Sequence, residues 1–130
     1  MVFTLSQDII LVNMLHFELA EFDSPDDKGS GKYMDESFLM MLDDARSIAG
    51  IPFTINSGFR TKSHNAYVGG KEQSSHLFGY AVDIHCTDSR RRWIIIDALR
   101  QAGFSRFGVG NTFIHVDNDP AKDFSVMWLY

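Results

Sequence analysis

The sequence is poor in the features that mark several large classes of protein. It contains a single cysteine, Cys86, so a disulfide cannot form within the chain. No stretch approaches the roughly 20 consecutive apolar residues of a membrane-spanning helix. The first residues lack the positively charged start and the small-residue cleavage site of a secretory signal peptide. We therefore expect neither a disulfide scaffold nor membrane insertion. We expect the protein to be made in the cytoplasm.

Basic charge is also scarce. Lysine and arginine number 12 against 17 aspartates and glutamates, which gives a net charge of 12 − 17 = −5. A surface that binds nucleic acid normally carries a positive patch, so we expect no nucleic-acid partner. The 130 residues suit one small domain, and we expect a monomer. The predicted domain spans residues 1–130, of which 1–16 could form an N-terminal extension.

Hydrophobic periodicity predicts helices and strands along most of the chain. The predicted helices, each with its N-cap in parentheses, are residues 8–15 (Ser6), 35–49 (Asp35) and 90–102 (Ser89). In the last helix, Trp93 begins an apolar face that we expect to be buried. The predicted strands are residues 53–56, 80–85, 104–109 and 112–116. This order predicts an α+β domain with an antiparallel sheet and helices packed mainly on one side.

A histidine and an aspartate, His76 and Asp83, lie seven positions apart. Residues 80–85 alternate between apolar and other side chains, as in a strand with one buried face. Asp83 lies on the opposite face, together with Ala81, and Gly79 precedes them in the same register. The two small residues leave open space beside Asp83, into which His76 can fold back from the preceding loop.

A third polar side chain is predicted to join this pair from the strand at 112–116. His76, Asp83 and His115 would form a set of two imidazoles and one carboxylate. Three protein ligands with one position left open is the arrangement of a catalytic zinc. His85 shares the face of Asp83 but lies about 7 Å further along the strand. We therefore expect His85 to be exposed or to lie outside the ligand set.

These residues resemble the signature of a known family. The motif reads Ser74-x-His76-x-x-Gly79-x-Ala81-x-Asp83, followed by Ile114-His115-Val116-Asp117. It is similar to the M15 family of zinc peptidases, which includes D-alanyl-D-alanine carboxypeptidases and the endolysins of phages. The segment Ser57-Gly58-Phe59-Arg60 is similar to the part of these enzymes that carries a substrate-binding arginine. The resemblance implies a Hedgehog/DD-peptidase fold, Zn2+ as cofactor and a peptidoglycan stem peptide as substrate.

The resemblance also implies roles for residues around the metal. Arg60 would hold a substrate carboxylate in a bidentate hydrogen bond, and Ser74 would bind substrate or support the loop of His76. Many members of the family carry Asp or Glu three positions before the last zinc histidine, where this chain has Thr112. Threonine cannot act as a general base. Asp117 is the available carboxylate, either as that base or as a group that orients a ligand histidine.

Three functions are consistent with these features. The first is a zinc-dependent peptidase that hydrolyses D-amino-acid-containing bonds of peptidoglycan, encoded by a phage for cell-wall degradation. Such an enzyme would reach the wall or periplasm at host lysis or as part of a virion. The second is a non-catalytic zinc-binding module of the same fold, with a structural or wall-binding role. The third is an acidic protein organised by calcium through Asp23, Asp26 and Asp27, although their spacing differs from that of an EF-hand.

Overall fold

The structure is a computed structural model that describes residues 2–4, 10–12 and 14–130. Two short strands near the N-terminus pair antiparallel, β1 (Val2–Thr4) and β2 (Ile10–Val12). The helices are α1 (Glu36–Ala49), α2 (Lys62–Tyr67) and α3 (Ser89–Gln101), with short 3₁₀-helices η1 (Leu19–Phe22), η2 (Ser30–Tyr33) and η3 (Ser75–Phe78). The remaining strands are β3 (Ile55–Ser57), β4 (Ala81–His85), β5 (Arg106–Val109), β6 (Phe113–Asp117) and β7 (Val126–Leu129).

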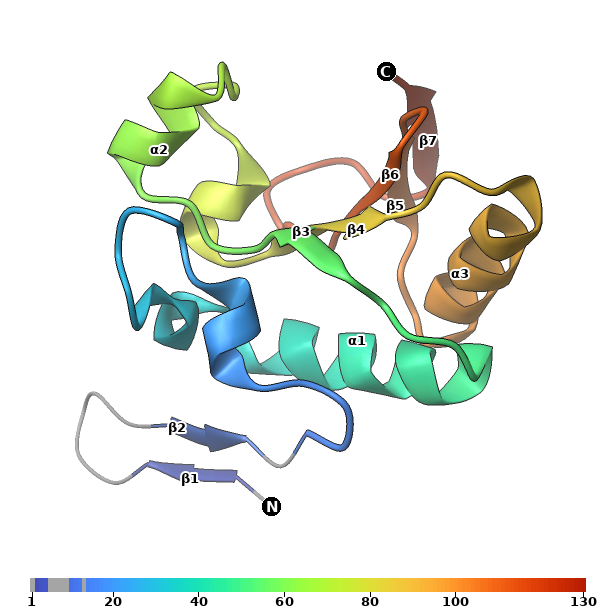
Figure 1. The fold of residues 1–130 in the computed structure, drawn as a ribbon, viewed down its shortest axis with the longest axis horizontal. Helices are drawn as coiled ribbons and strands as arrows, with labels where there is room; N and C mark the ends of the chain where they lie inside the picture. The colour runs from blue at the N-terminus through green and yellow to red at the C-terminus, as the bar shows by residue number, and fades with distance from the viewer. Residues whose placement is uncertain (1, 5–9, 13) are drawn as a thin grey trace.

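The main sheet contains five strands in the order β3-β4-β6-β5-β7 (Figure 1). Its pairs are antiparallel except for β5 and β7, which run parallel at one end of the sheet. The predicted α+β fold class is therefore confirmed. Strand β7 was not predicted, because its residues read only as an apolar tail. None of the described helices has the length and apolar character needed to cross a membrane.

One face of the central strands forms the hydrophobic core. Four side chains of β4 and β6 are completely buried there: Val82, Ile84, Ile114 and Val116. They belong to one cluster with buried residues of α1 and α3, and these two helices also pack against each other. Figure 1 shows α1 and α3 on the same side of the sheet, with α2 on the other side. The opposite face of β4 and β6 is left for polar side chains.

The ends of α1 follow the sequence prediction. The Asp35 carboxylate accepts a hydrogen bond from the backbone N–H of Phe38 at 2.9 Å, which caps the helix. Gly50 ends the helix with a φ of 69°, a left-handed conformation in which glycine carries no steric penalty.

Helix α3 begins one residue earlier than predicted. Asp88, rather than Ser89, is its N-cap, because the Asp88 carboxylate accepts a hydrogen bond from the backbone N–H of Arg91 at 3.0 Å. Trp93 is 71% exposed, so the prediction that it faces the core was wrong. The buried residues of α3 are Ile95, Ala98 and Leu99, since the helix contacts the core along the neighbouring stripe.

The predicted N-terminal helix at residues 8–15 was wrong where the structure describes the chain. Residues Ile10–Val12 form β2 and pair antiparallel with β1. The run contains isoleucine and valine, which favour strands, and it lacks the 3.6-residue apolar period of a helix. Ser6 and Asp8, the expected cap and first-turn acid, lie outside the described residues.

Candidate metal centre

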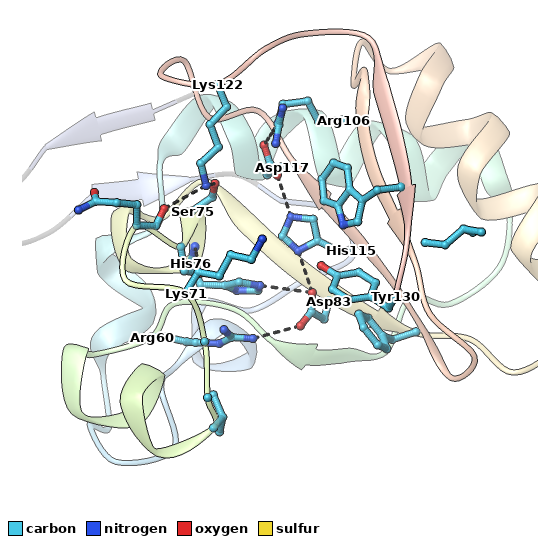
Figure 2. A pocket seen from close by; sticks show the side chains of 18 residues that line it. Arg60, Lys71, Ser75, His76, Asp83, Arg106, His115, Asp117, Lys122 and Tyr130 are labelled. Carbon is cyan, nitrogen blue, oxygen red and sulfur yellow. Dashed lines mark hydrogen bonds and ion pairs between the residues drawn. The ribbon is translucent and has the colours of Figure 1, made fainter.

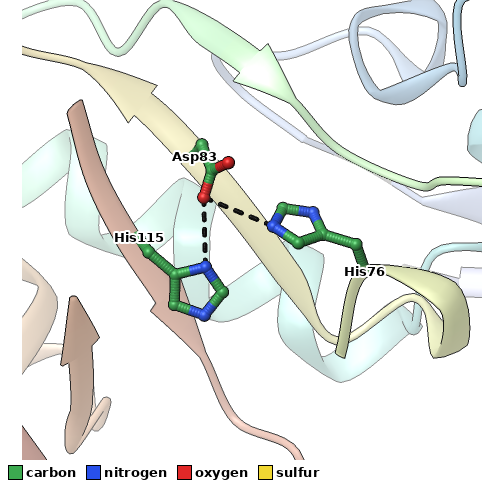
Figure 3. A group of neighbouring side chains, drawn as sticks. All are labelled: His76, Asp83 and His115. Carbon is green, nitrogen blue, oxygen red and sulfur yellow. Dashed lines mark hydrogen bonds and ion pairs between the residues drawn. The ribbon is translucent and has the colours of Figure 1, made fainter. Parts of the chain in front are cut away.

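Three polar side chains converge on the face of the sheet opposite the core. His76, Asp83 and His115 each offer one ligand atom, and these atoms lie within 4.8 Å of one another. Asp83 Oδ1 is 3.3 Å from His76 Nε2 and 3.0 Å from His115 Nδ1. Figure 3 shows the carboxylate of β4 between the imidazoles of η3 and β6. The structure thus brings together the three residues that the sequence predicts as metal ligands.

His76 is held by a short helix that folds back over the sheet. The hydroxyl of Ser74 accepts a hydrogen bond from the His76 backbone N–H at 3.2 Å and caps η3. Gly79 then turns the chain into β4 with a φ of 78°. An added Cβ at Gly79 would lie 2.3 Å from the carbonyl oxygen of Tyr33, so this tight turn requires glycine. Ser74 therefore supports the loop, one of the two roles predicted for it.

The contacts of His76 determine which ring nitrogen is available. Its Nδ1 lies 2.8 Å from the backbone carbonyl oxygen of Gly58. A carbonyl can only accept, so the Nδ1–H donates this bond and Nε2 faces Asp83 without a proton when the ring is neutral. His76 is therefore oriented to offer Nε2 to a metal.

His115 is oriented by a carboxylate behind it. Its Nε2 lies 2.7 Å from Asp117 Oδ2, where the ring N–H donates to the carboxylate, and its Nδ1 points toward Asp83. Asp117 is almost completely buried, and its other oxygen accepts from Arg106 Nε at 2.6 Å and from the Asp119 backbone N–H at 3.2 Å. These contacts are those of a carboxylate that orients a ligand histidine, the second of the two roles predicted for Asp117.

The electrostatics of the cluster suit a cation. Burial would raise the pKa of Asp83, but the hydrogen bond from His115 and the neighbouring His76 imidazole hold that pKa well below its usual value. Burial lowers the pKa of His76, which keeps its imidazole neutral. Burial also acts to lower the pKa of His115, but hydrogen bonds to Asp117 and Asp83 outweigh it and raise this pKa. A metal bound here would take the place of the proton on His115 Nδ1.

Arg60 lies beside the cluster, just after β3. Its guanidinium donates to Ser57 Oγ at 3.1 Å, to Asn65 Oδ1 at 3.2 Å and to Asp83 Oδ2 at 3.3 Å. The ion pair with Asp83 positions Arg60 at the site rather than on the outer surface. A carboxylate group bound by this guanidinium would lie next to the three predicted ligands.

A pocket of about 720 Å3 opens above the cluster (Figure 2). Its wall includes two lysines that the sequence did not single out, Lys71 and Lys122. The Lys122 ammonium donates to the backbone carbonyl of Gln73 at 3.0 Å and to Ser75 Oγ at 2.8 Å. Ser75 in turn donates to Asp119 at 2.7 Å. These bonds tie the loop after β6 to the helix that carries His76.

Sequence reasoning also missed three residues at the other side of the pocket. Arg106, Trp128 and Tyr130 line it, and the Arg106 guanidinium lies 5.2 Å from the centre of the Trp128 ring. The alternation of Trp128 and Tyr130 in the final segment is a strand signal that would have placed both on one face. His85 is exposed, as the sequence predicts.

The acidic loop that suggested calcium uses its carboxylates internally. Asp23 accepts from the backbone N–H groups of Gly29 at 3.0 Å and Gly31 at 2.7 Å. Asp26 accepts from the Thr61 hydroxyl at 2.7 Å. These are the hydrogen bonds of an ordinary polar loop.

The donor set at the cluster fits zinc. Zinc in proteins is bound by imidazole nitrogens and carboxylate oxygens, and catalytic sites use three protein ligands. The cluster supplies two imidazoles and one carboxylate, each oriented by a further hydrogen bond or ion pair. Together with the small α+β fold, it defines the chain as a protein with a zinc site of the catalytic kind.

Comparison with known proteins agrees with this class. The model of the family described as Peptidase M15 matches residues 15–117. The chain belongs to the peptidase M15 family. It is also similar to the zinc D-Ala-D-Ala carboxypeptidase of Streptomyces albus G, with 37% identity over 54 residues. That segment covers 42% of this chain and 21% of the relative, so the chain matches about a fifth of the relative's length.

Proposed function

We propose that this chain is a zinc peptidase that hydrolyses peptide bonds containing D-amino acids in bacterial peptidoglycan. The observation that carries this proposal is the cluster of His76, Asp83 and His115 in an open pocket, with the Arg60 guanidinium beside it. Membership of the M15 family and the similarity to a zinc D-Ala-D-Ala carboxypeptidase support Zn2+ as the metal and the stem peptide as the substrate.

The residues of the pocket suggest how the substrate is held. Zinc bound by the three ligands would lower the pKa of water and polarise the scissile carbonyl. Arg60 would bind a carboxylate of the substrate through its planar guanidinium, which offers two parallel N–H groups. The ion pair with Asp83 Oδ2 brings that carboxylate close to the ligand atoms. Ser74 lines the same pocket and would contact the peptide beyond the scissile bond.

Hydrolysis adds water across the C–N bond of the amide, so a group must accept a proton from water and the amine must leave with one. Among the described residues that line the pocket, the carboxylates are Asp83 and Asp117. Asp117 Oδ2 would have to release the His115 N–H before it could act as the base. We therefore assign Asp117 the orienting role, and the base role is the alternative that its substitution tests.

A second candidate is a zinc-bearing module that binds the wall without cutting it. The contacts of Asp117 favour this candidate. Both oxygens of Asp117 accept hydrogen bonds, from His115, Arg106 and the backbone of Asp119, so neither is free to take a proton from water. Thr112, at the position where many family members carry an acid, is exposed and has no carboxylate to offer. Both candidates predict zinc, and they differ in turnover.

The experiment that separates them combines metal analysis with a digestion assay. We expect mass spectrometry of the purified chain to find about one zinc per chain. Purified peptidoglycan incubated with the zinc-loaded protein should release muropeptides that carry new amino and carboxyl termini. Zinc and sedimentation with peptidoglycan, without release, would favour the module. No zinc after reconstitution would contradict both candidates.

The proposed biological setting is cell-wall degradation by a phage at host lysis or from a virion. This setting implies intact, cross-linked peptidoglycan as the natural substrate. The digestion assay should therefore use whole sacculi beside isolated stem peptides. Cleavage of the isolated peptides without cleavage of the sacculi would argue against this setting.

A further inference from the structure

Strand β7 and the residue after it form a wall of the metal pocket. Trp128 and Tyr130 both line the pocket, and they share one face because strand side chains alternate. This wall lies outside residues 15–117, the segment matched by the family model. Trp128 and Tyr130 therefore lie beyond the segment that carries the family match.

The register of the sheet places this wall beside a predicted ligand. Asp83 pairs with His115 across β4 and β6, His115 pairs with Gly108 across β6 and β5, and Gly108 pairs with Trp128 across β5 and β7. These four residues form one row across four strands. The Trp128 and His115 ring centres are 5.5 Å apart, although a strand separates them.

Gly108 makes this approach possible. A Cβ added at Gly108 would lie 2.5 Å from Tyr130 Cε2 and 2.6 Å from Trp128 Nε1. Both aromatic side chains therefore lie directly over the Gly108 backbone. Tyr130 Cε2 is adjacent to the carbon that bears the hydroxyl, so the polar end of the phenol lies close to the row that contains His115.

The Tyr130 hydroxyl is directed into the site. Figure 2 shows Tyr130 and Arg60 on opposite sides of Asp83. Tyr130 is 67% exposed, as suits a residue at the mouth of a pocket, and its ring packs against Phe113 at 4.9 Å between centres. Partial burial raises the pKa of Tyr130, and the negative charges of Asp83 and Asp117 act in the same direction. The hydroxyl is therefore protonated at neutral pH and can donate a hydrogen bond.

We propose that Tyr130 is a catalytic residue whose hydroxyl donates a hydrogen bond to the oxygen of the scissile carbonyl, from the side opposite Arg60. This inference rests on the peptidase function proposed above. The carbonyl oxygen gains negative charge as water adds to the carbonyl carbon. A fixed O–H donor binds that oxygen more strongly in the transition state than in the substrate, which accelerates the reaction. The hydroxyl keeps its proton throughout.

Trp128 holds this donor in place as a positioning residue. Its ring is covered by the Arg106 guanidinium on one side and approaches the Tyr130 ring at 6.4 Å between centres. Arg106 also donates to Asp117, which orients His115. The aromatic wall and the orientation of His115 therefore share one arginine.

The test is Tyr130→Phe, which removes the hydroxyl and keeps the ring. Loss of one such donor typically lowers kcat by about 100-fold or more, and we expect that loss with KM and zinc content unchanged. Tyr67→Phe is the matched control, because Tyr67 is 87% exposed and does not line the pocket. This control should keep the kcat of the unmodified chain.

A binding measurement gives a readout that does not depend on turnover. The probe is the phosphinate analogue of the D-Ala-D-Ala peptide bond, titrated calorimetrically into the zinc-loaded protein. Tyr130→Phe should lower the affinity for the analogue by a factor similar to the loss in kcat, and leave the affinity for D-alanine unchanged. Tyr67→Phe should leave both affinities unchanged.

The outcomes separate this inference from the proposed function. Equal kcat and equal analogue affinity in Tyr130→Phe and the unmodified chain would overturn the role of Tyr130 and leave the peptidase intact. Failure of the unmodified chain to bind the analogue would overturn the inference, whereas a lack of zinc would first overturn the proposed function. An equal loss of affinity for the analogue and for D-alanine would show that Tyr130 only shapes the pocket, which would also contradict its catalytic role.

Gly108→Ala is a second variant that leaves every hydroxyl in place. The new Cβ would collide with both aromatic rings and push them from the row. We expect a loss of kcat comparable to that of Tyr130→Phe in protein that thermal unfolding shows to be folded. A folded Gly108→Ala variant with unchanged kcat would contradict the dependence of catalysis on this wall.

Discussion

On strands β4 and β6, alternate residues face two different environments. The core face carries Val82, Ile84, Ile114 and Val116, all fully buried against the helices. The site face carries Asp83, His115 and Asp117, each held by hydrogen bonds or ion pairs. Apolar side chains gain free energy from burial alone, whereas buried polar groups need specific partners. Substitutions on the two faces should therefore affect different properties of the protein.

The largest expected effect is on the site face, with His76→Ala. This change removes one of three predicted ligands, so zinc per chain should fall from about one to near zero, and peptide hydrolysis should fall to background. The matched control is His85→Ala, because His85 is exposed on the strand that carries Asp83. Zinc analysis and the digestion assay should find this control unchanged. Equal zinc in the two variants would contradict the ligand assignment.

A smaller effect is expected from Asp117→Asn, which removes the charge behind His115. An orienting carboxylate typically contributes about 10- to 100-fold in metal affinity, so zinc should bind that much more weakly. Competition with a chelator measures this affinity, and turnover should recover in part at saturating zinc. Unchanged zinc affinity with turnover abolished would instead identify Asp117 as the general base.

The smallest effect is expected on the core face, from Ile84→Val. Removal of one buried methylene should lower the free energy of unfolding by about 0.5–1.5 kcal/mol, measured by urea denaturation. Zinc content should not change, because the substitution faces away from Asp83. Ile48→Val on α1 is the control: this side chain is 46% exposed, so stability should change by less than about 0.5 kcal/mol. A loss of zinc in Ile84→Val would show that the two faces are not independent.

The sequence predicted the metal cluster because its signal is local. His76 and Asp83 are joined by a short turn whose glycine is visible in the motif, and strand alternation orients Asp83 and His115. The same alternation identified the buried residues of β4 and β6. The α+β class followed from the order of helical and strand patterns.

The far wall of the pocket could not be predicted in the same way. Trp128 approaches His115 only because β7 pairs in parallel with β5 in a particular register. No turn of fixed length sets that register, and a shift by one residue would direct Trp128 and Tyr130 to the other face. Arg106 was missed for a related reason, since its partner Asp117 lies on the neighbouring strand.

The two imidazoles of the site are oriented by different kinds of acceptor. His76 donates to the main-chain carbonyl of Gly58, and an added Cβ at Gly58 would lie 2.7 Å from Phe22 Cα. His115 donates to the side chain of Asp117. A single codon change can remove the second acceptor, but every amino acid retains the carbonyl that forms the first. A side chain at Gly58 would nevertheless meet the backbone of Phe22 and shift that carbonyl, so the orientation of His76 depends on the packing around Gly58 and that of His115 on one side chain.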